Sequence, residues 1–302
     1  AAPTCADPGG SLEDRLAADK KRSYPVLCRL PENKFVPLGS TEIPDWRFQR
    51  ERDADWALAF SEEPYAQYRQ WEGEAPRDLY AVDLKTGLRQ QLVQQLRCSP
   101  QLSPEANYIF WWSDPDTAWY ANRTGQKWVR RLTDNRSVNF FNEESDVPDY
   151  PGTYGMAGWL AGDSALLVYD RYDIWKIDPD GEVAPERLTQ GRENLTSYRY
   201  LRLDPEERAI QPDAKILLHQ FNHSSKAEGY AWLNLNTNFL QPWIGSDHDY
   251  TRSPIKAEKA DQLIFARQNY QNFPDLLLIQ LPPLQTSNLQ LPTSNFKPPT
   301  SN

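Results

Sequence analysis

DLYAVD, at Asp78–Asp83, is the first of five copies of one short apolar and aromatic pattern in this 302-residue chain. Most copies carry a polar or turn residue on each side. They recur roughly every 40 to 55 residues, a period typical of β-sheet repeats arranged radially. The sequence therefore predicts an all-β fold. The other four copies are TAWYAN at Thr117–Asn122, DIWKID at Asp173–Asp178, GYAWLN at Gly229–Asn234 and PDLLLI at Pro274–Ile279.

Each copy is expected to be the third of four strands. An apolar strand precedes it, as at Trp56–Phe60, and a turn such as Lys85–Gly87 follows, where glycine supplies a positive φ. A fourth strand ends near a Leu-Thr pair, as at Leu132-Thr133. Such a sheet has two apolar faces and hides both only by stacking against neighbours. We therefore predict a β-propeller of four-stranded antiparallel blades, incomplete in this chain; the 25 prolines disfavour long helices.

Three segments are expected along the chain. Residues 1–23 are polar and predict a leader or linker, and residues 24–282 hold the blades, as a partial repeat, four full ones and another partial one. In the first partial repeat, Val26-Leu27 and Phe35–Leu38 are candidate strands that close a sheet begun upstream. Residues 283–302 form a tail rich in Pro, Thr, Ser and Asn.

Composition limits the partners and the compartment. The net charge of −9 argues against a nucleic-acid partner, and no apolar run approaches the roughly 20 residues of a membrane helix. The three cysteines are too scattered for a metal site, so we expect no metal and no cofactor. If the protein is exported, to the periplasm or cell surface, Cys5 and Cys28 are a candidate disulfide and Cys98 a lone buried thiol. Cleavage of a signal peptide before Ala1 would explain why the sequence opens with Ala1-Ala2-Pro3-Thr4. The sequence alone does not decide the localisation.

Several longer stretches resemble one family. They are similar to the non-catalytic propeller of bacterial prolyl oligopeptidase family serine peptidases, above all large members from Bacteroidetes-like bacteria. The resemblance covers most of residues 45–280. Its stretches are WEG at 71–73, RDLY at 77–80, DLKTG at 83–87, NEESDVPD at 142–149, YGMAGW at 154–159, LVYDRYDIWKIDPDG at 167–181, YRYLRLDPEE at 198–207 and NFPDL at 272–276.

That family pairs its propeller with a C-terminal α/β-hydrolase domain bearing Ser, Asp and His. The nucleophile of such a domain lies in a Gly-x-Ser-x-Gly turn, which this sequence lacks. We expect no catalytic residue in this chain, whether or not its parent protein is an enzyme. The resemblance implies that the propeller gates and positions peptide substrates for the absent hydrolase domain. A stand-alone propeller, acting as a protein- or ligand-binding scaffold in the cell envelope, is the alternative.

The candidate substrate-binding residues are Glu143, Glu144 and Arg171. The two glutamates belong to an acidic stretch, which favours a solvated loop over a calcium site because it matches no calcium-loop pattern. In dipeptidyl-peptidase relatives a glutamate pair binds the free amino terminus of the substrate, but the surrounding residues differ here. Strand alternation would place Arg171 and Asp173 on one face, with Arg171 paired to a carboxylate between blades. Contact with a peptide or with the hydrolase domain is the alternative for Arg171.

Two other groups of residues have a structural and a functional interpretation. His219 and His223 are four apart, a zinc-binding spacing on a helix, but they follow a predicted strand and are expected to be ordinary strand-end or loop histidines. A set of aromatic residues is expected to pack between blades rather than to bind a glycan. That set is Trp111, Trp112, Trp119, Tyr120, Trp128 and Trp159.

Overall fold

The computed structural model describes residues 16–17, 20–30, 33–51, 53–72 and 75–281. The described residues fall into two compact units. The first unit runs to Gln190 and includes Arg208–Pro212, and the second holds Gly191–Glu207 and the residues from Asp213 onward. Each unit is described by itself.

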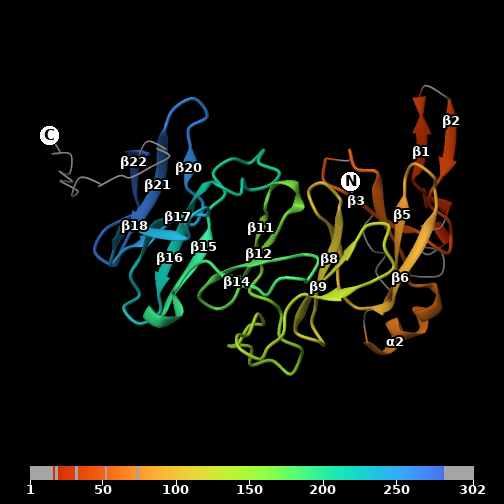
Figure 1. The fold of residues 1–302 in the computed structure, drawn as a ribbon, viewed down its shortest axis with the longest axis horizontal. Helices are drawn as coiled ribbons and strands as arrows, with labels where there is room; N and C mark the ends of the chain where they lie inside the picture. The colour runs from red at the N-terminus through yellow and green to blue at the C-terminus, as the bar shows by residue number, and fades with distance from the viewer. Residues whose placement is uncertain (1–15, 18–19, 31–32, 52, 73–74, 282–302) are drawn as a thin grey trace. The chain divides into compact units, whose positions relative to one another are not determined.

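The first unit contains three four-stranded antiparallel sheets and one two-stranded sheet, each made of consecutive strands (Figure 1). Its strands are β1 (Val26–Arg29), β2 (Lys34–Pro37), β3 (Asp45–Phe48), β4 (Trp56–Ser61), β5 (Arg77–Asp83), β6 (Arg89–Leu96), β7 (Gln101–Leu102), β8 (Tyr108–Ser113), β9 (Ala118–Arg123), β10 (Arg130–Arg131), β11 (Met156–Trp159), β12 (Leu166–Tyr169), β13 (Ile174–Ile177) and β14 (Glu186–Arg187).

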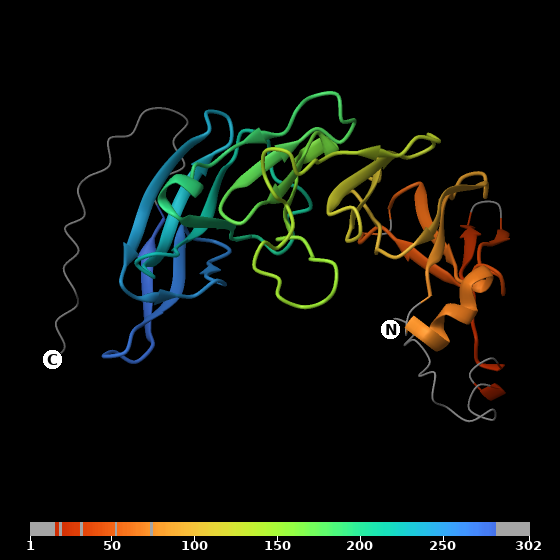
Figure 2. The same ribbon diagram turned by 90° about the horizontal axis from the view of Figure 1, so that it is seen from below.

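The second unit contains two further four-stranded sheets, drawn in green-blue to blue in Figures 1 and 2. Short helical turns occur in both units. The strands of the second unit are β15 (Thr196–Tyr200), β16 (Lys215–Asn222), β17 (Glu228–Asn234), β18 (Phe239–Ser246), β19 (Asp249–Tyr250), β20 (Ile255–Lys256), β21 (Gln262–Gln268) and β22 (Asp275–Gln280). The helical turns are η2 (Glu63–Tyr68), α2 (Arg69–Glu72), η3 (Ala161–Asp163) and η4 (Arg192–Asn194).

The five copies of the repeated pattern form β5, β9, β13, β17 and β22. Of the five four-stranded sheets, counted along the chain from β3, the first four have this strand as the third of four, hydrogen-bonded to the second and the fourth. The turn glycines Gly87, Gly125 and Gly181 have φ of 77°, 78° and 66°, which only glycine adopts without strain. The expected all-β fold of four-stranded antiparallel blades is thus confirmed. None of the described sheets closes on itself, as in an incomplete propeller.

The Leu-Thr pairs have a structural role at the fourth strand. The N–H of Leu188 donates to the carbonyl of Ile174 at 2.9 Å, and the Thr189 hydroxyl accepts the Ile174 N–H at 3.1 Å. In the second sheet, Leu132 and Thr133 make the same two bonds with Trp119. The threonine side chain therefore continues the strand ladder by one bond.

The core lies between stacked sheets, as β8 demonstrates. All six of its residues are buried. Ile109 packs with Leu58 of the first sheet, whereas the adjacent Phe110 packs with Trp159 of the third. Because alternate strand residues point to opposite faces, this strand is buried from both sides. Of the six aromatic residues singled out above, Trp111, Trp112, Trp119 and Trp159 are buried in these cores and Tyr120 is partly buried against one of them.

Two sheets depart from the regular four-stranded pattern. Strands β1 and β2 pair with each other, with Leu27 opposite Val36, and neither has a third partner among the described residues. The upstream sheet that they are expected to close lies outside the described residues. In the last sheet the first strand is broken, since β19 and β20 pair with different ends of β21.

The last sheet is also buried on one face only. Leu263 and Phe265 of β21 are in the core, but the side chain between them, Ile264, is 41% exposed. Its cross-strand neighbours Ile255 and Leu278 are exposed as well. This sheet therefore has, within the described part of the chain, one apolar face without a covering layer.

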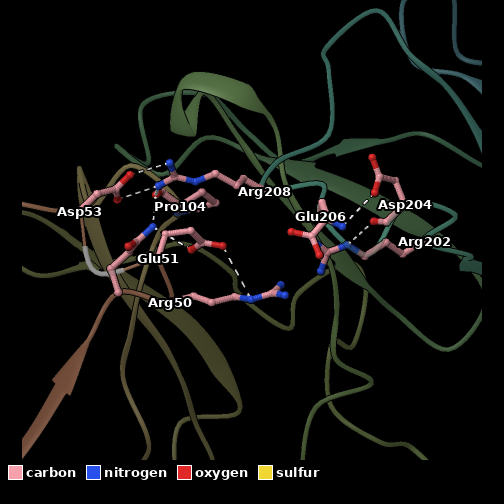
Figure 3. A network of polar contacts seen from close by, with 9 residues as sticks. Arg50, Glu51, Asp53, Pro104, Arg202, Asp204, Glu206 and Arg208 are labelled. Atoms are coloured by element: carbon pink, nitrogen blue, oxygen red, sulfur yellow. Dashed lines mark hydrogen bonds and ion pairs between the residues drawn. The ribbon is translucent and has the colours of Figure 1, made fainter. Parts of the chain in front are cut away.

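Arg208 ties together connections of the first unit (Figure 3). Its guanidinium donates to both carboxylate oxygens of Asp53, at 2.8 and 3.0 Å, and to the carbonyl of Pro104 at 2.9 Å. Asp53 lies between β3 and β4, and Pro104 lies between β7 and β8. Two residues later, Ile210 forms a parallel bridge with Leu160, next to the third sheet. The segment 208–212 thus fixes the connections of three sheets.

The residues Asp170–Asp173 form a tight turn, not a strand. The N–H of Asp170 donates to the carbonyl of Asp173, and the Asp170 carboxylate accepts the N–H groups of Tyr172 and Asp173. Both aspartates are fully buried. The predicted strand alternation over these residues is therefore wrong, because the aspartate side chain satisfies the backbone of the turn. Arg187 pairs with Asp173, at 2.6 Å.

Candidate functional site

A long loop projects from the first unit between β10 and β11, drawn in yellow-green in Figures 1 and 2. Phe141 and Thr153 form an antiparallel bridge at its base, and the N–H of Asn142 donates to the carbonyl of Gly152 at 2.7 Å. The preceding Phe140 is buried and packs edge-on against Trp175. The base of the loop is therefore anchored in the core while the residues between 143 and 150 are exposed.

Local hydrogen bonds hold both glutamates of this loop. Glu143 donates its backbone N–H to the Tyr154 hydroxyl at 2.9 Å, and its carboxylate accepts the Asn139 amide at 3.1 Å. Glu144 donates its N–H to the Asn142 side chain at 3.1 Å. These bonds fix the backbone at the start of the loop, and the Asn139 amide orients the Glu143 carboxylate.

Arg171 reaches the same place from the turn between β12 and β13. Its guanidinium donates to the Glu144 carboxylate at 2.5 Å and lies over the Tyr172 ring, 5.3 Å from the centroid. The arginine side chain is 28% exposed and the glutamate side chain 59% exposed. Arg171 thus pairs with a carboxylate, as expected, and that carboxylate belongs to the connection between the second and third sheets.

The structure therefore brings Glu143, Glu144 and Arg171 together, although 27 residues separate the ion pair in sequence. Burial raises the pKa of Tyr154, on which the charges of all three residues act. Sequence reasoning missed the roles of Asn139 and Tyr154, which orient Glu143. The exposed carboxylates can accept hydrogen bonds from an ammonium group, and the guanidinium beside them can donate to a carbonyl. No cluster of possible metal ligands occurs among the described residues.

His219 is not the strand-end histidine that the sequence predicts. It lies within β16, is 3% exposed, and its Nε2 is 3.1 Å from the buried carboxylate of Glu228 on β17. The same carboxylate accepts the N–H of Tyr250 at 3.0 Å. Burial lowers the pKa of His219 and outweighs the opposing effect of Glu228. This pair joins β16, β17 and β19 inside the second unit.

His248 has a serine neighbour that the sequence did not reveal as a pair. The Ser246 hydroxyl lies 2.8 Å from Nδ1 of His248, and Asp247 lies 3.2 Å from the same nitrogen. The amide nitrogen of Asn269 faces Nε2 at 3.2 Å. A catalytic relay needs its serine and its acid on opposite ring nitrogens. This arrangement is therefore not a Ser-His-Asp triad.

The two described cysteines, Cys28 and Cys98, are free thiols. Cys5, the suggested partner of Cys28, lies outside the described residues. Burial raises the pKa of Cys98 to about 12, so its thiol stays protonated and unreactive at neutral pH.

No family model matches the chain, and no curated protein matches it. Solved structures are similar over most of its length. Porphyromonas gingivalis dipeptidyl peptidase 4 has a TM-score of 0.48 and 11% identity, over 86% of this chain and 43% of that chain. A dipeptidyl aminopeptidase IV homologue from Bacteroides ovatus has a TM-score of 0.48 and 7% identity, over 84% and 44%. The β-propeller domain of the Pyrococcus furiosus Trilobed protease has a TM-score of 0.36 and 8% identity, over 84% and 86%.

The chain spans less than half the length of the first two of these proteins. Across the described residues, none of the helices has the length and apolar character needed to cross a membrane.

The buried histidine generates a prediction for pH dependence. Since the pKa of His219 is lowered in the folded state, the unfolded chain binds the proton more readily once the pH falls below about 6.5. Neutral His219 therefore contributes to the free energy of unfolding above that pH. This contribution is lost as the pH falls further, by at most about 1.4 kcal/mol per pH unit. Urea unfolding between pH 7.5 and 5.5 should show a smaller loss for His219→Gln than for the unmodified chain. Equal losses in both proteins would contradict this assignment.

Proposed function

We propose that this chain is the non-catalytic propeller of a prolyl oligopeptidase family serine peptidase. In this role it gates and positions peptide substrates for a hydrolase domain on the same protein. The sequence stretches that resemble this family support the proposal, as do the consecutive four-stranded sheets with their glycine turns. Catalysis belongs to the hydrolase domain, and the propeller contributes by excluding folded proteins and by orienting peptides.

The observation that carries the proposal is the cluster of Glu143, Glu144 and Arg171. Its two glutamates lie on a loop whose base is fixed in the core, and Arg171 reaches them from the turn between β12 and β13. The glutamates can accept the ammonium group at the amino terminus of a peptide, and Arg171 can donate to a peptide carbonyl. The Glu144–Arg171 pair contributes little to stability, because it is too exposed for a strong net attraction. Such a pair can exchange partners with an incoming peptide at low cost.

Peptide binding to this cluster gives the first test. Titration calorimetry with a short peptide should show affinity at least about tenfold higher for a free amino terminus than for its acetylated form. The double variant Glu143→Gln/Glu144→Gln should remove this preference, since the amide side chains keep their size but lose both charges. Glu182→Gln, an exposed change elsewhere in the first unit, is the control. The free energy of unfolding of the double variant should change by less than about 1 kcal/mol.

Two outcomes would contradict the assignment of this cluster. One is equal affinity for free and acetylated peptides. The other is an equal loss of binding in the double variant and in Glu182→Gln.

The reaction class is tested on the longer protein. If the reading frame continues past Asn302 into a hydrolase domain, a Gly-x-Ser-x-Gly sequence should follow within about 200 residues. The corresponding protein should cleave short peptides and be labelled by a serine-directed phosphonate. A stop codon directly after Asn302 would favour the stand-alone scaffold, and an extended protein without labelling would refute the peptidase assignment.

A further inference from the structure

Two arginines of the first sheet converge on one phenylalanine ring. Arg47 lies on β3 and Arg77 is the first residue of β5, and these strands flank β4, which carries Phe60. The guanidinium carbons lie 5.9 and 4.7 Å from the centroid of the Phe60 ring. Two positive charges are thus held beside one aromatic side chain.

Neither guanidinium has a carboxylate partner in the described part of the chain. Arg47 donates to the carbonyl of Pro100 at 2.7 Å, and Arg77 donates to the carbonyl of Cys98 at 3.4 Å. No ion pair with a described residue is formed by either arginine. Each guanidinium has five N–H donors, so most donors of both groups remain available.

The nearest acidic neighbours in sequence do not compensate these charges. Asp78 follows Arg77 on β5, but it points to the opposite side of the sheet and is buried there. Its carboxylate accepts the Tyr65 hydroxyl and the Gln91 amide, each at 2.8 Å. Asp45 shares the face of β3 with Arg47 but forms no ion pair with either arginine.

The pair is electrostatically unfavourable as it stands. Both side chains are partly buried, and burial together with the neighbouring charge of Arg77 lowers the pKa of Arg47. This occurs in a chain with 42 acidic residues and a net charge of −9, where carboxylates to neutralise an arginine are plentiful. An anion placed between the two guanidinium groups would relieve their repulsion and use their free donors.

We propose that Arg47 and Arg77 form a binding site for a carboxylate. The planar fork of each guanidinium matches the two oxygens of a carboxylate, and Phe60 holds both forks in place. The carboxyl terminus of a peptide and an acidic side chain share this chemistry. The site is separate from the glutamate cluster and does not depend on the function proposed for it.

The test is titration calorimetry on the whole chain with three probes. These are N-acetyl-Ala-Ala with a free carboxylate, its carboxamide, and N-acetyl-Asp carboxamide, whose only carboxylate is in the side chain. The free carboxylate should bind at least about tenfold more tightly than the carboxamide. The third probe decides between a peptide terminus and an acidic side chain as the source of the anion.

Variants assign the binding to this site. Arg47→Gln and Arg77→Gln should each weaken carboxylate binding at least about tenfold. Arg130→Gln is the matched control, because Arg130 is an exposed arginine that lies 5.2 Å from the Trp128 ring centroid. The double variant Glu143→Gln/Glu144→Gln should keep carboxylate binding unchanged, which separates this proposal from the previous one.

Two further measurements keep the test decisive. If a glutamine variant does not fold, the Nε–H resonances of Arg47 and Arg77 in the unmodified chain should shift on addition of the carboxylate probe. Absence of binding would overturn the proposal, as would an equal loss of affinity in Arg130→Gln. Binding of inorganic phosphate in preference to both carboxylate probes would overturn the ligand class.

Discussion

The first unit depends on one constraint, that a four-stranded sheet with two apolar faces must be covered on both of them. The alternation of β8, in which Ile109 faces one neighbouring sheet and Phe110 the other, shows how the first unit satisfies it. The requirement explains why β4, β8 and β12 are buried along nearly their whole length rather than at every other residue. The polar elements then serve to position these sheets, as Arg208 does for three connections.

Much of this architecture could be predicted because its signals are local. The repeated third strand and the turn glycines act within a few residues of their own position, and the threonines of the Leu-Thr pairs bond a strand residue only 14 or 15 positions earlier, so the sequence pattern is sufficient. At Asp170–Asp173 the sequence predicts a strand where the structure has a turn, because alternating charged and aromatic residues also fit a strand. The broken first strand of the last sheet has no such local signal, since it depends on how two short segments pair with β21.

The candidate sites show the same difference between local signals and contacts made by distant segments. Glu143, Glu144 and Arg171 could be proposed from their charges, but their meeting depends on the return of a long loop to the turn after β12. The sequence predicts an ordinary strand-end or loop histidine at His219, because its partner Glu228 is identified only by the register of β16 and β17. The sequence does not indicate that Arg47 and Arg77 meet, because only the pairing of β3, β4 and β5 brings both to Phe60. Pairings across strands therefore carry the information that a single sequence does not display.

The two-sided burial of the central strands is the claim on which the fold rests, and adjacent residues of one strand test it directly. Ile109→Ala and Phe110→Ala remove side chains on opposite faces of β8, and urea unfolding measures the cost of each. If both faces are covered, each substitution should lower the free energy of unfolding by about 2 to 5 kcal/mol. A near-neutral effect at either position would mean that one face of β8 is open to solvent, and the stacked-sheet account would then be wrong.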